Sequence, residues 1–119
     1  MKDYIFSNVK DQLLNHLNNK KPGSIDDNYT RPVPHITLNN GVIISVQAST
    51  THYCHPKINY GVWDSVEVYL DRGMVSQELL KYQEGEGIML VMGFVPIDLV
   101  VAEIIVSGGI KEENNDENN

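Results

Sequence analysis

Several features that would assign this chain to a class of proteins are scarce in it. It contains one cysteine, one tryptophan and two phenylalanines among 119 residues. A single cysteine cannot close an internal disulfide, which fits a reducing compartment, and we expect the cytoplasm. No apolar run approaches the roughly 20 residues of a membrane span. The first residues lack a small-residue cleavage signature, so we predict neither a membrane segment nor a signal peptide.

Basic residues are also few. Nine Lys and Arg face 16 Asp and Glu, and the formal net charge is −7. Residues 111–119 hold four acids and one lysine. Binding to duplex nucleic acid depends on many basic residues that neutralise phosphates, so an acidic chain is a poor candidate for it. A small anionic ligand is harder to exclude, because one local basic pocket is enough to bind it.

The length predicts one domain with a modest core, which we place at residues 1–110. Within it, residues 20–34 contain three prolines and a glycine and are expected to form an irregular linker. Residues 111–119 are polar and acidic, and we predict a disordered tail there.

Apolar spacing predicts the order of the elements. The first segment repeats apolar residues at helical spacing and ends at Pro22-Gly23. Asn39-Asn40-Gly41 lies between two β-rich runs and is a strong hairpin signal. Further elements are expected as follows: an alternating strand at 63–70, a turn at 71–73, a short helix at 74–83, a central strand buried on both faces at 88–95, and a helix from Pro96 that Gly108-Gly109 closes.

This order predicts the α+β class, with a mainly antiparallel sheet on which an N-terminal and a C-terminal helix pack. The last helix is apolar on most sides. Such a helix in a short chain is often shared with a second subunit, so we expect a homo-oligomer. The alternative is that the helix fills the core of the monomer.

The run THYCHPK, residues 51–57, concentrates the reactive side chains. His52, Cys54 and His55 suggest a zinc site, with His35 as a further ligand, but their spacing matches no standard finger or ribbon. A cysteine nucleophile needs an activating base and an orienting group, and no oxyanion loop is recognisable. Cys54 more often packs inward as a small hydrophobe. We therefore predict no metal, no other cofactor and no catalytic residue.

The remaining interpretation of this run is a binding loop. Tyr53 or His52 offers a ring on which a base stacks, and Lys57 offers a cation for a phosphate. Gln47, which ends the preceding strand, is predicted to hydrogen-bond a base edge. Arg72, next to a turn, is predicted to close the pocket. The alternative is that the histidines are ordinary loop residues and the lysine is solvated.

Three quoted stretches carry a resemblance: ISVQASTTHYCHPK, WDSVEVYL and GFVPIDLVVAEIIVSGGI. They resemble small proteins of phages and prophages in which a Gln-Ala-Ser strand end precedes a His-Tyr-Cys-x-Pro-basic loop. A Ser-Val-Glu-Val strand and a Val-Pro helix with a double glycine follow. The likeness covers roughly residues 43–110. We expect the protein in the cytoplasm of its host cell.

The chain is also similar to the first family of Thoeris anti-defence proteins, sponges that sequester cyclic signalling nucleotides and block host immunity. This resemblance implies oligomers with pockets at subunit interfaces and capture without hydrolysis. It implies that Lys57 is the basic residue after the turn and that Tyr82 stacks on a base. Arginines that such a pocket uses near the C-terminus have no counterpart here, where only Lys111 is basic.

Three functions follow as hypotheses. The first is a non-enzymatic phage protein that binds and sequesters a cyclic nucleotide signal. The second is an acidic inhibitor that binds a host protein, motivated by the net charge and the tail. The third is a small hydrolase, metal-dependent or with a cysteine nucleophile, that uses the reactive residues of the 51–57 run.

Overall fold

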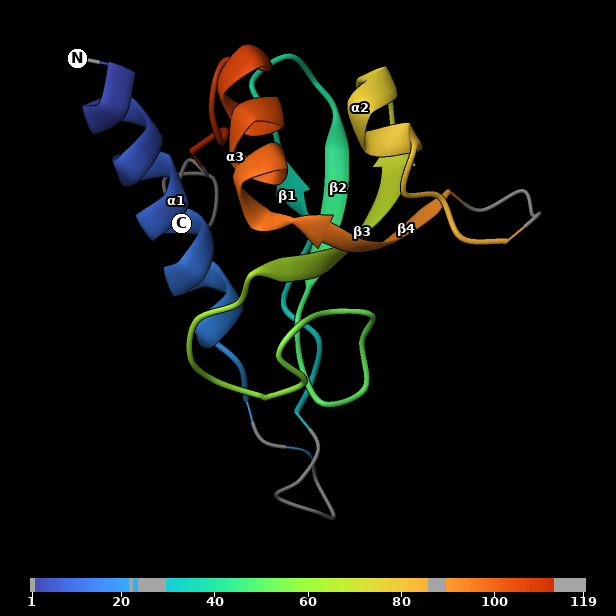
Figure 1. Ribbon diagram of the computed structural model, residues 1–119. Coiled ribbons are helices and arrows are strands. Elements are labelled where there is room, and N and C mark those ends of the chain that lie inside the picture. Colours follow the sequence, from blue (N-terminus) through green and yellow to red (C-terminus); the bar gives the residue numbers. More distant parts are fainter. Residues whose placement is uncertain (1, 22, 24–29, 86–89, 113–119) are drawn as a thin grey trace, which may run out of the picture.

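Two terminal helices and an antiparallel sheet form the framework of the fold (Figure 1). The structure is a computed structural model that describes residues 2–21, 23, 30–85 and 90–112. The expected α+β class is confirmed, and the four strands lie in the order β1-β2-β3-β4 with every pair antiparallel. The elements are α1 (Lys2–Asn18), β1 (Ile36–Thr37), β2 (Ile43–Gln47), β3 (Ser65–Arg72), α2 (Gln77–Leu80), β4 (Val91–Pro96) and α3 (Ile97–Val106).

The first hairpin forms where the Asn-Gly signal predicted it. The amide of Leu38 donates to the Val42 carbonyl over 2.8 Å, and the amide of Gly41 donates to the Leu38 carbonyl over 2.9 Å. Gly41 has a φ of 95°, a conformation that costs glycine little. The hairpin places Gln47 at the end of β2, where the loop that carries THYCHPK begins.

The prediction of a central strand at 88–95 is wrong. β4 begins at Val91 and lies at an edge of the sheet, next to β3 alone. Residues 88 and 89 lie outside the described residues. The outer edge of β4 is instead covered by two loops, because the amide of Gly93 donates to the Tyr82 carbonyl and that of Phe94 donates to the Tyr53 carbonyl. Covering by loops gives an apolar edge strand the burial that the sequence pattern suggested.

The turn predicted at 71–73 begins later than expected, since β3 continues through Arg72 and only Gly73 takes a positive φ, of 95°. The short helix also shrinks to Gln77–Leu80, with Ser76 at its cap position and no side-chain cap bond. The later start of the turn comes from pairing, because Arg72 is still aligned with Ile43 of β2, which extends the strand. Element ends are the least certain part of any pattern-based assignment.

The last helix packs within the chain. α3 starts after Pro96 with Asp98 in its first turn, and Gly108 and Gly109 close it with φ values of 89° and 96°. Its apolar face is buried against α1 and β4, and Figure 1 shows α1 and α3 side by side. An ion pair of 2.9 Å between Lys10 and Asp98 joins the two helices. The monomer core therefore accounts for most of the apolar character that suggested an oligomer.

The predicted linker and tail belong only in part to the residues that the structure describes. Residues 22, 24–29 and 113–119 lie outside the described residues. At the ends of the linker, Lys20 and Val33 are buried. Lys111, placed in the tail by the sequence, still donates its amide to the Thr37 carbonyl over 2.8 Å. Among the described residues, no helix is long and apolar enough to cross a membrane.

Candidate functional site

The loop of residues 48–64, between β2 and β3, carries the reactive run and is held at several points. His55 and Ser65 form a bridge, and the amide of Asp64 donates to the His55 carbonyl over 2.8 Å. Trp63 is fully buried, and its indole Nε1 donates to the Ile58 carbonyl. A loop so anchored presents its exposed side chains from a fixed backbone.

Lys20 is the anchor between this loop and the end of α1. Its ammonium donates to the carbonyls of Leu17 and Asn59, the latter over 2.7 Å, and lies 4.6 Å from the Trp63 ring centroid. The side chain is only 9 % exposed. Burial lowers the pKa of Lys20 to about 8, although the nearby Cys54 acts in the opposite direction.

Cys54 points into the core, as the sequence suggested. It is 1 % exposed, and its thiol donates to the Ser49 carbonyl over 3.1 Å. Burial raises the pKa of this thiol, and the Ser49 contact and nearby lysines only partly oppose that effect. A buried thiol with a raised pKa is a poor nucleophile, because the reactive form is the thiolate.

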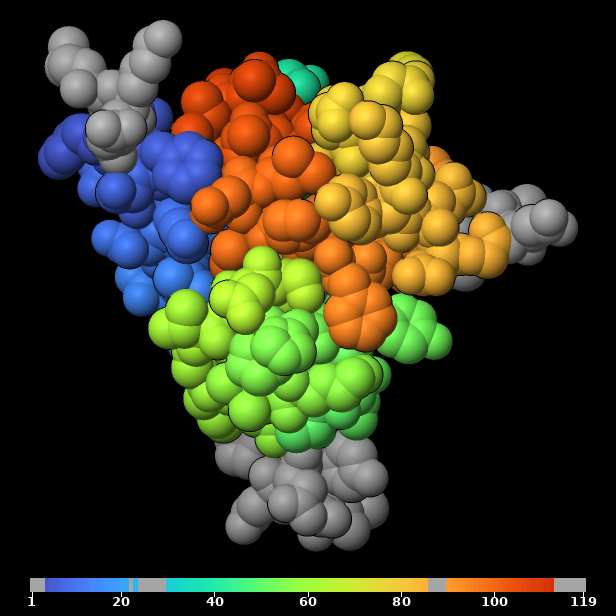
Figure 2. Space-filling view, viewed as in Figure 1, coloured from blue at the N-terminus to red at the C-terminus, as the bar shows by residue number. Residues whose placement is uncertain are grey.

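Tyr53, Lys57 and Phe94, which we call the aromatic cluster, meet on the surface beside the β4 edge. The rings of Tyr53 and Phe94 stack with centroids 5.9 Å apart and an angle of 27° between their planes. The Lys57 ammonium lies 5.7 Å from each centroid. Tyr53 is 50 % exposed and Phe94 is 44 % exposed. In Figure 2 the green loop segment and the orange segment of β4 adjoin on one face.

A β-bulge places Phe94 in this cluster. Val66 pairs with Val95 and Val68 pairs with Met92, so Glu67 alone lies opposite both Gly93 and Phe94. Phe94 has a φ of 51° and is the one residue other than glycine with a positive φ in the described part of the chain. That conformation is an outlier for a bulky side chain. The core does not explain it, because the ring is half exposed.

Glu67 holds the loop side of the aromatic cluster. Its Oε2 accepts the amide hydrogen of Tyr53 over 3.0 Å, and the Tyr53 carbonyl accepts the amide hydrogen of Phe94 over 2.9 Å. Gly93 lies in contact with Tyr53, because an added Cβ would stand 3.1 Å from the Tyr53 Cβ. These contacts hold Tyr53 and Phe94 beside each other, and about half of each side chain stays exposed.

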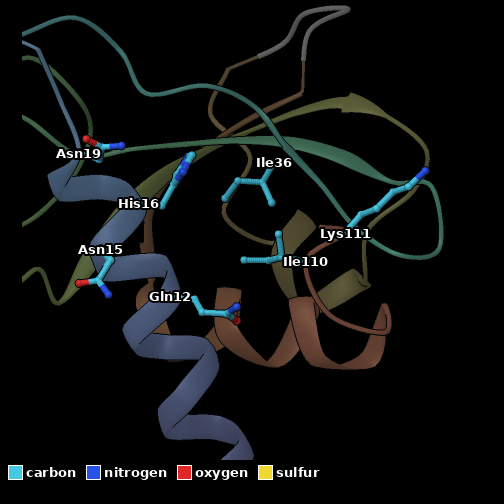
Figure 3. A pocket seen from close by; sticks show the side chains of 7 residues that line it. All are labelled: Gln12, Asn15, His16, Asn19, Ile36, Ile110 and Lys111. Atoms are coloured by element: carbon cyan, nitrogen blue, oxygen red, sulfur yellow. The ribbon is translucent and has the colours of Figure 1, made fainter. Parts of the chain in front are cut away.

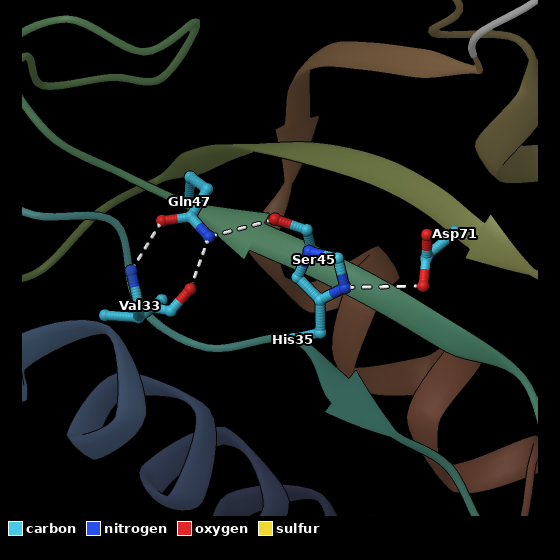
Figure 4. Close-up of polar contacts among 5 residues, drawn as sticks. All are labelled: Val33, His35, Ser45, Gln47 and Asp71. Atoms are coloured by element: carbon cyan, nitrogen blue, oxygen red, sulfur yellow. Dashed lines mark hydrogen bonds and ion pairs between the residues drawn. The ribbon is translucent and has the colours of Figure 1, made fainter.

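Two predicted binding residues, Gln47 and His52, are committed to contacts within the chain. Gln47 is 7 % exposed; its amide nitrogen donates to the Val33 carbonyl over 2.8 Å and to Ser45, and its Oε1 accepts from the Val33 amide (Figure 4). His52 is half-buried, with Nδ1 2.6 Å from the Ser49 hydroxyl. Gln47 thus holds the chain before β1, and both ends of its amide are engaged within the chain.

Burial lowers the pKa of His52, and Lys20 and Lys57 act in the same direction while Glu67 opposes them. The imidazole is therefore neutral at pH 7 and acts as a hydrogen-bonding group of the loop. Its backbone contributes to the site, because its carbonyl accepts a hydrogen bond from the Lys57 ammonium over 3.1 Å. This bond steadies the cation beside the two rings.

Arg72 and Tyr82 are placed differently from each other. Arg72 ends β3, five residues beyond Glu67, which separates the two by about 16 Å along an extended strand. The structure therefore does not bring Arg72 to the aromatic cluster. Tyr82 is half-buried against the core, but its carbonyl bonds the amide of Gly93, one residue from Phe94. The backbone of Tyr82 therefore lies next to the aromatic cluster. The stacking of its ring on a base remains a prediction.

The alternative metal site gains no support from the geometry. Among the described residues, no three His, Cys, Asp or Glu side chains gather closely enough to hold a metal ion. His55 instead pairs with Asp64 at 3.1 Å, and His35 pairs with Asp71 at 3.4 Å (Figure 4). Each histidine named for that site is engaged with a different partner.

Sequence reasoning missed Phe94 and Glu67. Phe94 lies inside the apolar run that predicts a strand buried on both faces, and Glu67 lies in the predicted alternating strand, where the pattern marks no binding role. One signal was available: Gly93 in the interior of a strand pattern often marks a bulge or a close approach.

Comparison with protein families, with curated proteins and with solved structures gave no match for this chain.

Proposed function

We propose that this protein is a non-catalytic binder of a nucleotide-like ligand and that the aromatic cluster is its binding surface. The observation that carries the proposal is Phe94, an exposed ring held at a φ of 51°. Backbone outliers of this kind cost of order 1–3 kcal/mol and cluster at ligand sites. A glycine would adopt this conformation with less backbone strain, so we infer that the Phe94 ring is kept there for its own contacts.

The chemistry of the aromatic cluster selects the ligand class. Two neighbouring rings offer a stacking surface, which accepts a base through its π face. The ammonium of Lys57, held by the His52 carbonyl, offers one charge for a phosphate. Among the described residues Lys57 forms no ion pair with a carboxylate, so an anionic ligand would compete with none.

Within this class we propose a cyclic nucleotide immune signal that the protein sequesters in the host cytoplasm. Support for this narrower statement comes from the resemblance to the Thoeris anti-defence sponges, which capture their ligand without hydrolysis. The geometry supports the base and the phosphate, and the resemblance supports the cyclic form and the phage origin. Sequestration requires that the bound ligand is released chemically intact.

Equilibrium dialysis against a panel of linear and cyclic nucleotides tests the proposal. We expect at least one cyclic member to be depleted from the free pool and recovered intact after heat denaturation. Lys57→Met keeps the length of the side chain and removes its charge, and it should weaken binding by about tenfold or more. Lys81→Met, at an exposed lysine that pairs with Glu78, is the matched control. A panel with no depleted member would refute the proposal.

A second candidate function is binding to a protein of the host. Ile58, Tyr60 and Val62 of the same loop are all exposed, and aromatic and aliphatic side chains on a protruding loop are common in protein interfaces. Pull-down from host lysate at low and high salt separates the two functions. Loss of a captured protein in a Val62→Glu variant that keeps nucleotide binding would favour the second.

A further inference from the structure

A groove lies at the other edge of the sheet, between α1 and β1. It has a volume of about 480 Å³, and its floor is formed by Ile36 of β1 and Ile110 beyond α3. Figure 3 shows these two side chains pointing toward each other, with Gln12 and His16 projecting from α1 beside them. The strand order puts β1 and β4 at opposite edges, so this groove is separate from the aromatic cluster.

The size and lining of the groove fit a small ligand. Sites for small molecules span about 300–1,000 Å³ and combine apolar walls with a few polar groups. Of the side chains that line this groove, Lys111 alone is a lysine, arginine, aspartate or glutamate, and Figure 3 shows its amine directed away from the two isoleucines. The floor therefore suits a neutral, flat ring that packs on two aliphatic side chains.

The imidazole of His16 sets the polarity that a ligand must have. Its Nε2 lies 2.9 Å from the Pro34 carbonyl oxygen, which can only accept, so Nε2 carries the hydrogen of this bond. In the neutral ring Nδ1 is then an acceptor. A ligand that meets Nδ1 must bring an N–H or O–H group to it.

Gln12 completes the set of polar groups. It precedes His16 by four residues, which places the two side chains on one face of α1 as neighbours. Its amide offers one acceptor oxygen and a donor nitrogen. Together the two residues present two acceptors and one donor above the isoleucines. An exocyclic amino group next to a ring nitrogen has the complementary pattern, and carboxamide side chains pair with adenine in this way.

We propose that the groove formed by Gln12, His16, Ile36 and Ile110 binds a neutral aminopurine nucleoside. The ring lies mainly on the half-buried Ile110 and touches the small part of Ile36 that is exposed, since Ile36 is 4 % exposed. One amino hydrogen is donated to His16 Nδ1 and the other to Gln12 Oε1, and the Gln12 amide nitrogen donates to the adjacent ring nitrogen. This site does not depend on the aromatic cluster, and either can exist without the other.

Methyl NMR of the isoleucines in the full chain tests the groove, with adenosine as the probe. We expect adenosine to shift the methyl signals of Ile36 and Ile110 and to leave those of Ile58 unchanged. Purine riboside, which lacks the amino group, leaves an acceptor unpaired and should bind about tenfold more weakly. Equal affinity for the two nucleosides, or unshifted Ile36 and Ile110 signals up to the solubility limit of adenosine, would overturn the assignment.

Three variants separate the groove from the rest of the protein. His16→Phe keeps a flat ring and removes the acceptor, and it should cost about the same tenfold. Asn8→Ala, at an exposed position of α1, is the matched control and should change nothing. Phe94→Gly should leave the adenosine shifts intact. If it abolishes them, the signal comes from the aromatic cluster and the groove is not a site.

Discussion

Replacing Phe94 tests whether its ring is kept in the bulge at the expense of backbone strain. In Phe94→Ala the φ of 51° remains unfavourable, while the stacking with Tyr53 and the contact with Lys57 are lost. Stacking contributes about 0.5–1.5 kcal/mol and the cation contact about 0.5–1 kcal/mol. We therefore expect Phe94→Ala to lower the free energy of unfolding by about 1–2 kcal/mol.

Phe94→Gly removes the same contacts but also relieves the strain. The left-handed conformation costs a residue with a Cβ roughly 1–2 kcal/mol, and glycine avoids this cost. The greater freedom of glycine in the unfolded chain lowers the free energy of unfolding by about 0.5–1 kcal/mol, which offsets part of that gain. Glycine should then be about 0.5–1 kcal/mol more stable than alanine at this position, and about 0.5–1 kcal/mol less stable than the native phenylalanine. Nucleotide binding should nevertheless be lost in both variants.

Urea unfolding followed by tryptophan fluorescence measures these differences, since the single Trp63 is buried. Val91, at the start of β4, is the matched control, because its φ is not positive and alanine should be more stable than glycine there. The reasoning is refuted if alanine is also the more stable residue at position 94. That order would mean that the bulge does not force a positive φ on Phe94.

Three further predictions follow from the described contacts. Gln47→Leu leaves the amide and carbonyl of Val33 unpaired in a buried place and should cost about 2–3 kcal/mol in urea unfolding, whereas an exposed Gln83→Leu should cost less than about 0.5 kcal/mol. The pKa of Lys20 is lowered to about 8 in the folded state, so between pH 8 and 10.5 the unfolded chain binds a proton that the folded chain has lost. Relative to Lys20→Met, the free energy of unfolding of the native protein should therefore rise by about 1–3 kcal/mol as the pH rises through that window. A difference that does not change with pH would contradict the burial of this ammonium. Because the pKa of His52 is also lowered, its contribution to the free energy of unfolding is complete above pH 6.5 and is lost as the pH falls below that value. A His52→Gln variant should therefore lose stability less steeply on acidification. An identical slope in the two proteins would count against the lowered pKa.

The sequence predicted those parts of the fold that depend on local pattern. The hairpin at Asn39-Asn40-Gly41 and the closure of the last helix by Gly108-Gly109 are set by backbone preferences of neighbouring residues, and both are confirmed. The class of the fold followed from the order of such elements. Local chemistry also predicted that Cys54 packs inward.

The arrangement of strands could not be predicted in this way. An apolar run such as 88–95 reads alike in a central strand and in an edge strand that loops cover, because periodicity reports burial and not the neighbour that causes it. The covering loops are joined to β4 through the backbone atoms of Tyr53 and Tyr82, which leave no side-chain signal. The same limit applies to the bulge that exposes Phe94.

The candidate site was predicted in part. Tyr53 and Lys57 lie together at the surface, as a binding loop requires, because both belong to one short run. The chemistry of Gln47 alone suggests a ligand contact, yet the chain before β1 passes beside it, and the side-chain amide of Gln47 forms hydrogen bonds with the Val33 backbone. Tertiary contacts between distant segments decide such assignments, and a single sequence does not reveal them.

Mass spectrometry of small molecules that co-purify with the protein from host cells tests whether the aromatic cluster binds a nucleotide. Native protein and the Lys57→Met, Phe94→Gly and Lys81→Met variants are purified in parallel and denatured by heat. We expect an intact phosphorylated nucleotide to be released by the native protein and by Lys81→Met, and little or none by the two variants of the aromatic cluster. Release of the same compound in equal amounts by all four proteins, or by none, would contradict this expectation.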